Sequence, residues 1–176
     1  MNCKQCGAPM KVEDDRNFFH CEYCGGYDFP NPNQDGVALL DEVAPYSCPI
    51  CSKPLVIAAI ENIRIFSCPI CRGNLISQSK MLPILRQARV PDRINEDPQR
   101  RPNRSELERK AICPVCQDAM DTYQYGGAGN IIIEGCSHCE MIWLDFGEIS
   151  RVVHAYSQMY QRQPDEPGQK TQSIKF

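Results

Sequence analysis

The sequence predicts a small, metal-stabilised, β-rich fold of three tandem ribbons, each built on a β-hairpin, with α-helices after the second and third. All twelve cysteines lie in Cys-x-x-Cys pairs, and the six pairs form three successive couples. Within each couple, two apolar, strand-like segments flank a polar or glycine-rich turn. Amphipathic helical periodicity follows the third couple, and a weaker copy follows the second.

The cysteine spacing is the ligand pattern of tetrahedral four-cysteine metal sites. Two residues between cysteines let one tight turn present both thiolates to one ion, and a second turn at the end of a hairpin supplies the other two. The intervening segments of 14, 16 and 19 residues are long enough for two short strands and a turn. We expect three Zn²⁺ ions, one per ribbon. The predicted ligands are Cys3, Cys6, Cys21 and Cys24; Cys48, Cys51, Cys68 and Cys71; and Cys113, Cys116, Cys136 and Cys139.

Disulfides and iron are the competing uses of these cysteines. Disulfides are favoured in small secreted domains, whereas this chain opens with Met-Asn-Cys-Lys-Gln and not with a charged and apolar signal sequence. Iron competes because the two Cys-Pro-Ile-Cys turns of the second ribbon also suit the single iron of rubredoxin-like sites. The sequence contains no apolar run long enough to span a membrane. We therefore expect a cytoplasmic protein with no membrane partner, in which zinc is favoured over iron.

Five units are predicted along the chain. They are ribbon one over 1–44, ribbon two with a short helix over 45–90, a linker over 91–110, ribbon three with a C-terminal amphipathic helix over 111–163, and a disordered tail over 164–176. Ribbons of about forty to fifty residues rarely bury enough apolar surface to fold alone. A structural metal is therefore expected to stabilise each one.

Helix boundaries differ between the ribbons. Asp145, followed three residues later by Glu148, resembles a capping box at the start of the last helix. After ribbon two, Pro83 predicts a helix that begins only at about Leu82, because proline is tolerated in the first turn. After ribbon one, prolines beginning with Pro30 predict that no helix follows.

The apolar stripe of the last helix has two interpretations. It packs on its own ribbon, or it exceeds what one hairpin covers and serves as a docking or self-association surface. The candidate docking residues are Ile149, Val152, Val153, Tyr156 and Tyr160.

Ribbon three carries a family resemblance. Cys113-Pro-Val-Cys116, a hairpin, Cys136-Ser-His-Cys139 and the ending Ile142-Trp143-Leu144-Asp145 with Gly147-Glu148-Ile149 resemble the bacterial zinc-ribbon family named after transcription factor IIB. The resemblance covers 113–150, with weaker copies at 48–90 and 3–29. It implies four-cysteine zinc binding and a ribbon fold. Met141 departs from a glycine of the family pattern, which ribbon two keeps as Gly73.

Charge is distributed unevenly over the chain. Residues 1–47 carry three basic and eight acidic side chains, whereas 48–90 carry six basic and one acidic. The basic set of ribbon two has two interpretations, as phosphate contacts for a nucleic acid or as an ordinary solvated face. The candidates for nucleic-acid contact are Lys53, Arg64, Arg72, Lys80, Arg86 and Arg89.

Other side chains near the cysteines have simpler interpretations. His20 and His138 adjoin the metal turns, but four cysteines already complete each site, so we expect surface or supporting roles for these histidines. Trp143 either packs against the hairpin or offers a stacking surface for a base, and packing is favoured.

The predicted function is that of a non-catalytic adaptor or assembly protein that engages protein partners. Four-cysteine sites are closed and leave no coordination position for a substrate. The alternative is a nucleic-acid or transcription-machinery binding protein that uses the basic middle ribbon and the linker. A third hypothesis is a rubredoxin-like iron protein.

Overall fold

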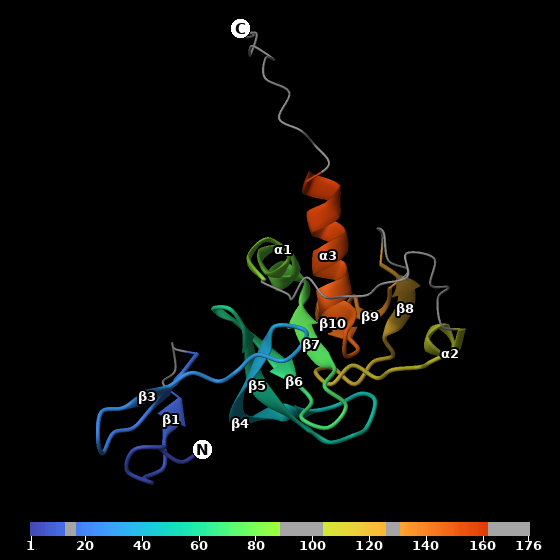
Figure 1. Ribbon diagram of the computed structural model, residues 1–176. Helices are drawn as coiled ribbons and strands as arrows, with labels where there is room; N and C mark the ends of the chain where they lie inside the picture. Colours follow the sequence, from blue (N-terminus) through green and yellow to red (C-terminus); the bar gives the residue numbers. More distant parts are fainter. Residues whose placement is uncertain (13–16, 89–103, 126–130, 162–176) are drawn as a thin grey trace, which may run out of the picture.

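The computed structural model describes residues 1–12, 17–88, 104–125 and 131–161. Within these ranges the chain forms a three-stranded sheet, a seven-stranded sheet and three α-helices (Figure 1). The predicted β-rich fold with three four-cysteine clusters is confirmed at this level. Residues 91–103 of the predicted linker and the predicted tail lie outside the described residues.

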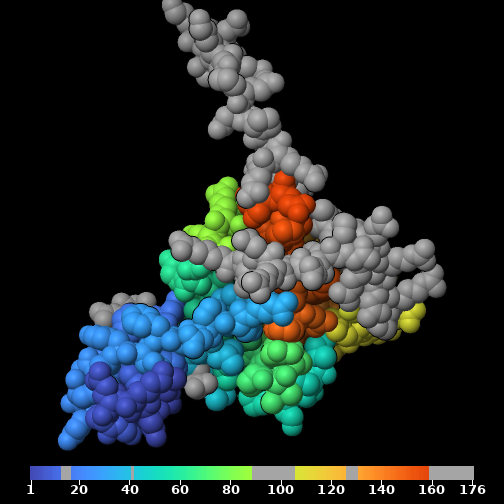
Figure 2. Space-filling model, viewed as in Figure 1, coloured from blue at the N-terminus to red at the C-terminus, as the bar shows by residue number. Residues whose placement is uncertain are grey.

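Ribbon one is the three-stranded sheet. Its antiparallel strands follow the order β1 (Lys11–Val12), β2 (Phe19–His20) and β3 (Tyr27–Asp28). Its buried core is small and consists of Cys3, Met10, Phe19 and Cys21. In the space-filling view this N-terminal part of the chain forms a lobe beside the rest of the molecule (Figure 2).

Ribbons two and three share the seven-stranded antiparallel sheet, in the order β4-β5-β6-β7-β10-β9-β8. The strands are β4 (Val37–Ser47), β5 (Pro54–Ile60), β6 (Ile63–Ser67), β7 (Asn74–Ser77), β8 (Asp121–Gln124), β9 (Ile132–Cys136) and β10 (Met141–Leu144). The two ribbons meet where β7 pairs with β10 at the centre of the sheet.

The junction between ribbons two and three is close to two-fold symmetric. Residues 71–82 align with 139–150 without a gap, and in that alignment Leu75 is equivalent to Trp143. These two equivalent residues pair directly across β7 and β10. Each ribbon thus contributes a last strand to the junction and a helix after it, as two subunits of a symmetric dimer would.

Side chains alternate between the two faces of the sheet along the central strands, so each face has its own apolar core. Ile76 and Ile142 point to the face covered by α1 (Gln78–Gln87) and α3 (Glu148–Gln161), where they join the larger apolar cluster. Leu75 and Trp143 point to the other face, into a cluster that contains cysteines of both metal sites. Both cores therefore cross the boundary between the ribbons.

The predicted division into separate ribbons two and three is corrected by this sheet. The unit boundaries at 44/45 and 91–110 followed the cysteine blocks, but strand pairing and burial of shared apolar surface join 45–90 to 111–163. The boundary at residue 44 also falls inside β4, which pairs with β5. Pairing between segments far apart in sequence leaves no local signal, so the cysteine spacing could not indicate it.

The helices also differ from prediction in one respect. α1 begins at Gln78 and contains Pro83, so the predicted start at about Leu82 is wrong. Proline removes one helical hydrogen bond, whereas burial of Met81 and Ile84 in the core stabilises the helix around it. The short α2 (Arg104–Leu107) precedes ribbon three. None of the described helices is long and apolar enough to cross a membrane.

Candidate metal centres

The Cys-x-x-Cys turns share one backbone conformation. The residue after the second cysteine has a positive φ in all six turns, with values of 76° and 73° at the glycines of ribbon one. Elsewhere non-glycine residues adopt this left-handed conformation, which costs roughly 1–2 kcal/mol each. The six residues are Gly7, Gly25, Ser52, Arg72, Gln117 and Glu140.

Backbone hydrogen bonds hold these turns in shape. In the first turn of ribbon two, the Cys48 N–H donates to the Lys53 carbonyl at 2.7 Å, and the Ser52 N–H donates to the Cys48 carbonyl at 3.0 Å. The N–H groups of Ile50 and Cys51 both point at Cys48 Sγ, at 3.4 Å. Such donors stabilise a thiolate, so the turn prepares its cysteine for a metal ion.

The sulfur positions fit one tetrahedral ion in each cluster. The four Sγ atoms of each set lie within 4.8 Å of one another. In ribbon one, Cys3 and Cys24 approach to 3.5 Å, as do Cys6 and Cys21. A Zn–S bond of about 2.3 Å places tetrahedral sulfurs about 3.8 Å apart, whereas a disulfide needs about 2.05 Å. The sulfur distances therefore fit metal ligation and not disulfide bonding.

The sites differ in burial. In ribbon one, Cys6 and Cys24 are exposed, although their partners are buried. In ribbons two and three the second cysteine of each pair is only partly exposed and the first is buried. The metal position of ribbon one is therefore the most open to water.

The pKa values of the thiols are shifted in both directions. The pKa of Cys3 is lowered to about 7 by backbone N–H groups of Gln5 and Cys6. The pKa of Cys51 is likewise lowered to about 7, chiefly by the backbone N–H of Lys53. Burial raises the pKa of Cys48 to about 11. A cluster that holds four thiolates at neutral pH therefore needs a cation to replace the protons.

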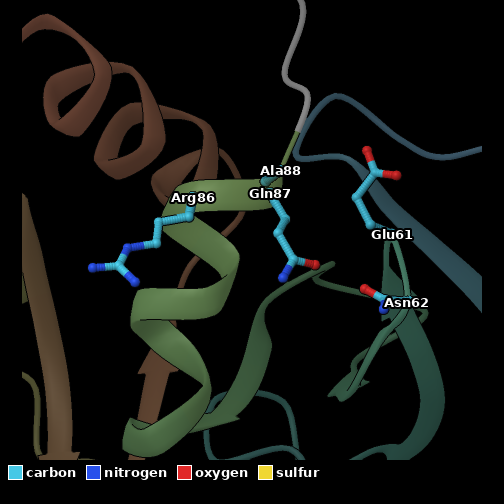
Figure 3. Close-up of a pocket in the computed structure, with 5 residues that line it drawn as sticks. All are labelled: Glu61, Asn62, Arg86, Gln87 and Ala88. Atoms are coloured by element: carbon cyan, nitrogen blue, oxygen red, sulfur yellow. The ribbon is translucent and has the colours of Figure 1, made fainter. Parts of the chain in front are cut away.

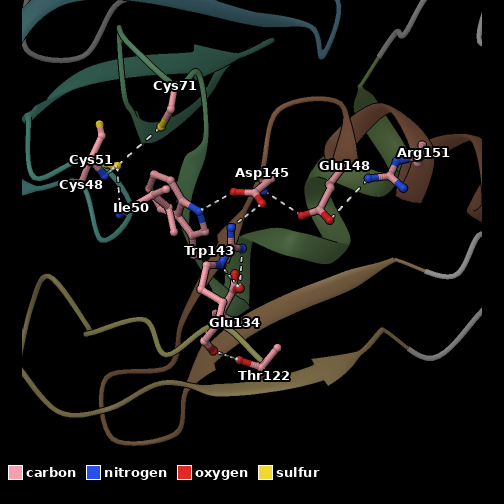
Figure 4. A network of polar contacts seen from close by, with 11 residues as sticks. Cys48, Ile50, Cys51, Cys71, Thr122, Glu134, Trp143, Asp145, Glu148 and Arg151 are labelled. Carbon is pink, nitrogen blue, oxygen red and sulfur yellow. Dashed lines mark hydrogen bonds and ion pairs between the residues drawn. The ribbon is translucent and has the colours of Figure 1, made fainter. Parts of the chain in front are cut away.

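A buried polar network links ribbon three to its helix (Figure 4). Arg109, which lies between α2 and the first metal turn, forms ion pairs with Glu134 on β9 and with Asp145 after β10. Asp145 Oδ1 also accepts from Trp143 Nε1 at 3.0 Å, and the Asp145 N–H donates to Glu148 Oε2 at 2.7 Å. The network fixes the tryptophan relative to the start of α3.

Burial raises the pKa of both glutamates in this network. Glu148 is 1% exposed, and desolvation raises its pKa to about 8. The pKa of Glu134 is raised by the same cause, although Arg109 opposes the shift. Glu134 Oε2 has no hydrogen-bond partner among the described atoms. Poor solvation of the charge therefore disfavours ionisation of both carboxyls, and at Glu134 the ion pair with Arg109 offsets part of this effect.

The cap of α3 comes from another part of the chain. Of the predicted capping box, the bond from the Asp145 N–H to Glu148 is formed. The backbone N–H groups at the start of α3, however, donate to the side chain of Asp35. The Gly147 N–H donates at 2.7 Å and the Ser150 N–H at 3.2 Å. Asp35 is fully buried, and it joins the segment after ribbon one to the helix of ribbon three.

Trp143 is fully buried and packs across the ribbon junction. A Cβ atom on Gly73 would lie 2.3 Å from Trp143 Cζ2, so the ring rests directly on the glycine of ribbon two. This contact supports packing and not base stacking. At the equivalent position of ribbon three stands Met141, which joins the same cluster beside the smaller Leu75.

The predicted docking stripe lies mostly in the core. Ile149, Val152 and Val153 are each 2% exposed and belong to the cluster between the helices and the sheet, with Tyr156 packed against it. The side chain of Tyr160 lies outside the described residues. The docking interpretation is therefore wrong for the three buried residues, because the shared sheet and α1 cover what one hairpin could not.

The predicted basic residues lie in several places. Lys80 Nζ donates to the Arg64 carbonyl at 2.7 Å, so these two residues are neighbours. Arg72 lies in a metal turn, with its guanidinium 3.8 Å from the centre of the Phe146 ring. Arg86 projects from the end of α1 beside a hollow (Figure 3). Lys53 is exposed, and Arg89 lies outside the described residues.

The histidines lie outside the four-cysteine sets. His138 Nδ1 lies 3.0 Å from Asp118 Oδ2, and both side chains are exposed. His20 stacks on Tyr27 with ring centres 4.9 Å apart. His154 contacts Gln158 one turn further along α3.

Sequence reasoning missed Asp35, Arg109 and Glu134. A charged residue inside the apolar run Ile131-Ile132-Ile133-Glu134 is the signal that could have found Glu134, because a strand buried on both faces rarely carries an unpaired carboxylate. Asp35 and Arg109 give no such local signal.

Comparison with known proteins supports the zinc-ribbon assignment for the third cluster. Residues 112–155 match the model of the family described as transcription factor zinc-finger, the TFIIB-type zinc ribbon. No curated protein and no solved structure matches the chain. The family match and the three four-cysteine clusters together support zinc binding.

Proposed function

We propose that the protein is a cytoplasmic, non-catalytic adaptor or assembly protein whose three zinc ions stabilise binding surfaces for protein partners. One observation carries this proposal: all twelve cysteines converge in three closed four-sulfur sets. Such sites hold a fold together but offer no open position to a substrate. The remaining surface is therefore the functional part of the molecule.

The hollow at the end of α1 fits this reading. It is lined by Glu61, Asn62, Arg86, Gln87 and Ala88, and Arg86 projects away from Glu61 and Asn62 (Figure 3). These residues supply no nucleophile next to a general base. The hollow therefore gives no support to an enzymatic function.

The decisive experiment is affinity purification of the full chain from its native cells, followed by mass spectrometry, with elemental analysis of the same material. The expected result is three zinc ions per chain and stoichiometric protein partners. A matched variant reverses the charge of Arg64, Arg72 and Arg89 and should retain those partners. Recovery of no partner protein contradicts the adaptor proposal, and iron with a visible absorption band supports the rubredoxin-like alternative.

A second candidate function is nucleic-acid binding through ribbon two and the linker. The charge of residues 48–90, six basic against one acidic side chain, favours it. An anisotropy titration that shows micromolar binding, weakened steeply by salt and lost in the charge-reversed variant, would support this candidate over the adaptor.

A further inference from the structure

Ribbon one carries a cluster of aromatic rings outside its core. Phe18 meets Tyr27 edge to face with ring centres 5.5 Å apart, and it meets Phe29 at 5.3 Å. His20 stacks on the same Tyr27 at 4.9 Å. These four residues, Phe18, His20, Tyr27 and Phe29, are called the ring face below.

Strand register places the ring face on one side of the sheet. His20 pairs with Tyr27 across β2 and β3, so the two side chains share a face. Phe18 lies two residues before His20 and Phe29 lies two residues after Tyr27, so the two-residue alternation places both on the same side. Phe19 alternates to the opposite side, where it is 3% exposed in the ribbon core. The ring face therefore points away from the core.

The exposure of these rings exceeds what sheet stability requires. Cross-strand pairing of His20 with Tyr27 stabilises a small sheet. Phe29, however, follows β3 and is 68% exposed, and Tyr27 is 57% exposed. Large apolar side chains gathered on an exposed surface mark interaction sites.

Charge indicates what binds there. Residues 1–47 carry eight acidic and three basic side chains. The two lysines of the ribbon are each engaged by a carboxylate, Lys4 by Asp28 and Lys11 by Glu22, both at 2.8 Å. The negative field repels phosphates but attracts cations, and aromatic faces bind guanidinium groups directly.

We propose that the ring face is a docking surface for an arginine-rich, extended segment of a partner protein, with guanidinium groups stacked on Tyr27 and Phe29. This inference rests on the proposed adaptor function and names the surface and the chemistry of its ligand. Ribbon one, to which these four residues belong, forms a lobe beside the rest of the molecule (Figure 2). Besides the chain connection, Asn17 joins it to ribbon two, donating to the Glu61 carbonyl at 3.3 Å and accepting from Arg64 Nε at 3.2 Å.

The test is fluorescence anisotropy of a labelled peptide of alternating arginine and serine, titrated with the full chain. The wild type is expected to bind it, and the double variant Tyr27→Ala/Phe29→Ala is expected to bind it at least roughly tenfold more weakly. Tyr23→Ala is the matched control, because Tyr23 is 84% exposed on the same ribbon but stands apart from the ring contacts. It should change binding by less than about twofold. Circular dichroism checks that each variant stays folded.

Several results would overturn the inference. These are no binding of the arginine peptide by the wild type, equal binding by the double variant, or tighter binding of short oligothymidylate that the same double variant abolishes. Partner capture by the double variant at wild-type level would refute the ring face while leaving the adaptor function intact. If the wild type captured no partner protein at all, the adaptor function itself would be refuted.

Discussion

Ribbon one and the joined pair of ribbons two and three use the same cysteine unit in different surroundings. Ribbon one has two-residue strands and a separate core of four residues, with two of its ligands exposed. Ribbons two and three share a seven-stranded sheet and two apolar clusters, and their ligands are more buried. The difference shows that the same metal turns can supply half of the buried core of a small unit or form one part of a larger core.

The largest expected difference follows loss of one ligand. Cys21→Ser removes one metal and should unfold ribbon one alone, because zinc supplies on the order of 10–16 kcal/mol to comparable small domains. Cys136→Ser should lower protection against hydrogen exchange in both ribbons two and three, since Cys136 lies in their shared cluster.

Hydrogen exchange with mass spectrometry, alongside elemental analysis of bound metal, compares the two variants. If Cys136→Ser lost exchange protection only within residues 111–161, ribbons two and three would fold independently. That result would contradict a shared core.

The next effect tests the junction itself. Trp143→Ala should cost about 3–5 kcal/mol of unfolding free energy, since it empties a buried space between the ribbons. Gly73→Ala should cost about 1–3 kcal/mol, because its new Cβ atom meets the ring. With Trp143 already removed, Gly73→Ala should become nearly neutral.

Denaturant unfolding of the double-mutant cycle measures this coupling. Additive costs in unfolding free energy would mean that the two residues do not contact. Hydrogen exchange is the control: a loss of exchange protection in ribbon one would mean that the substitutions destabilise the whole chain and not the junction alone.

A pH effect is expected in the joined pair. The pKa of Glu148 rises from 4.5 to about 8 on folding, so the unfolded chain releases this proton first. Between these values the unfolded state binds fewer protons, and stability falls as pH rises, by on the order of a few kcal/mol. Glu148→Gln should flatten this slope, because glutamine keeps the neutral form.

Unfolding free energies of both proteins at about pH 6 and about pH 9 check the prediction. Asp145, Arg151 and Glu134 also face this carboxyl and are unchanged in the variant. Equal slopes for both proteins would assign the pH dependence to other groups.

The smallest effect concerns the link between the two regions. Asp35→Ala should cost about 1–2 kcal/mol, because two N–H groups of the first turn of α3 lose their acceptor. Asp28→Ala is the control, since its ion pair with the 77% exposed Lys4 contributes about 0–1 kcal/mol. Thermal unfolding of both variants tests the difference, and equal costs would show that the Asp35 cap is dispensable.

The sequence determined the local parts of this protein. The spacing of the cysteines predicted the three clusters, because two residues between ligands and a hairpin between pairs bring four sulfurs together within one short segment. It also predicted two apolar strands joined by a turn within each couple, as β5 and β6 show in ribbon two, and the helices after ribbons two and three. Each of these depends on residues that are close in the chain.

Only the tertiary structure decided how the ribbons combine. The pairing of β7 with β10, the contact of Trp143 with Gly73 and the cap from Asp35 join residues from 64 to 115 positions apart, and their energy appears only when the segments meet. Four-residue strands carry too little pattern to name a partner. The apolar stripe of α3 was visible in the sequence, but whether it faced solvent or a second ribbon depended on burial that no single ribbon could provide.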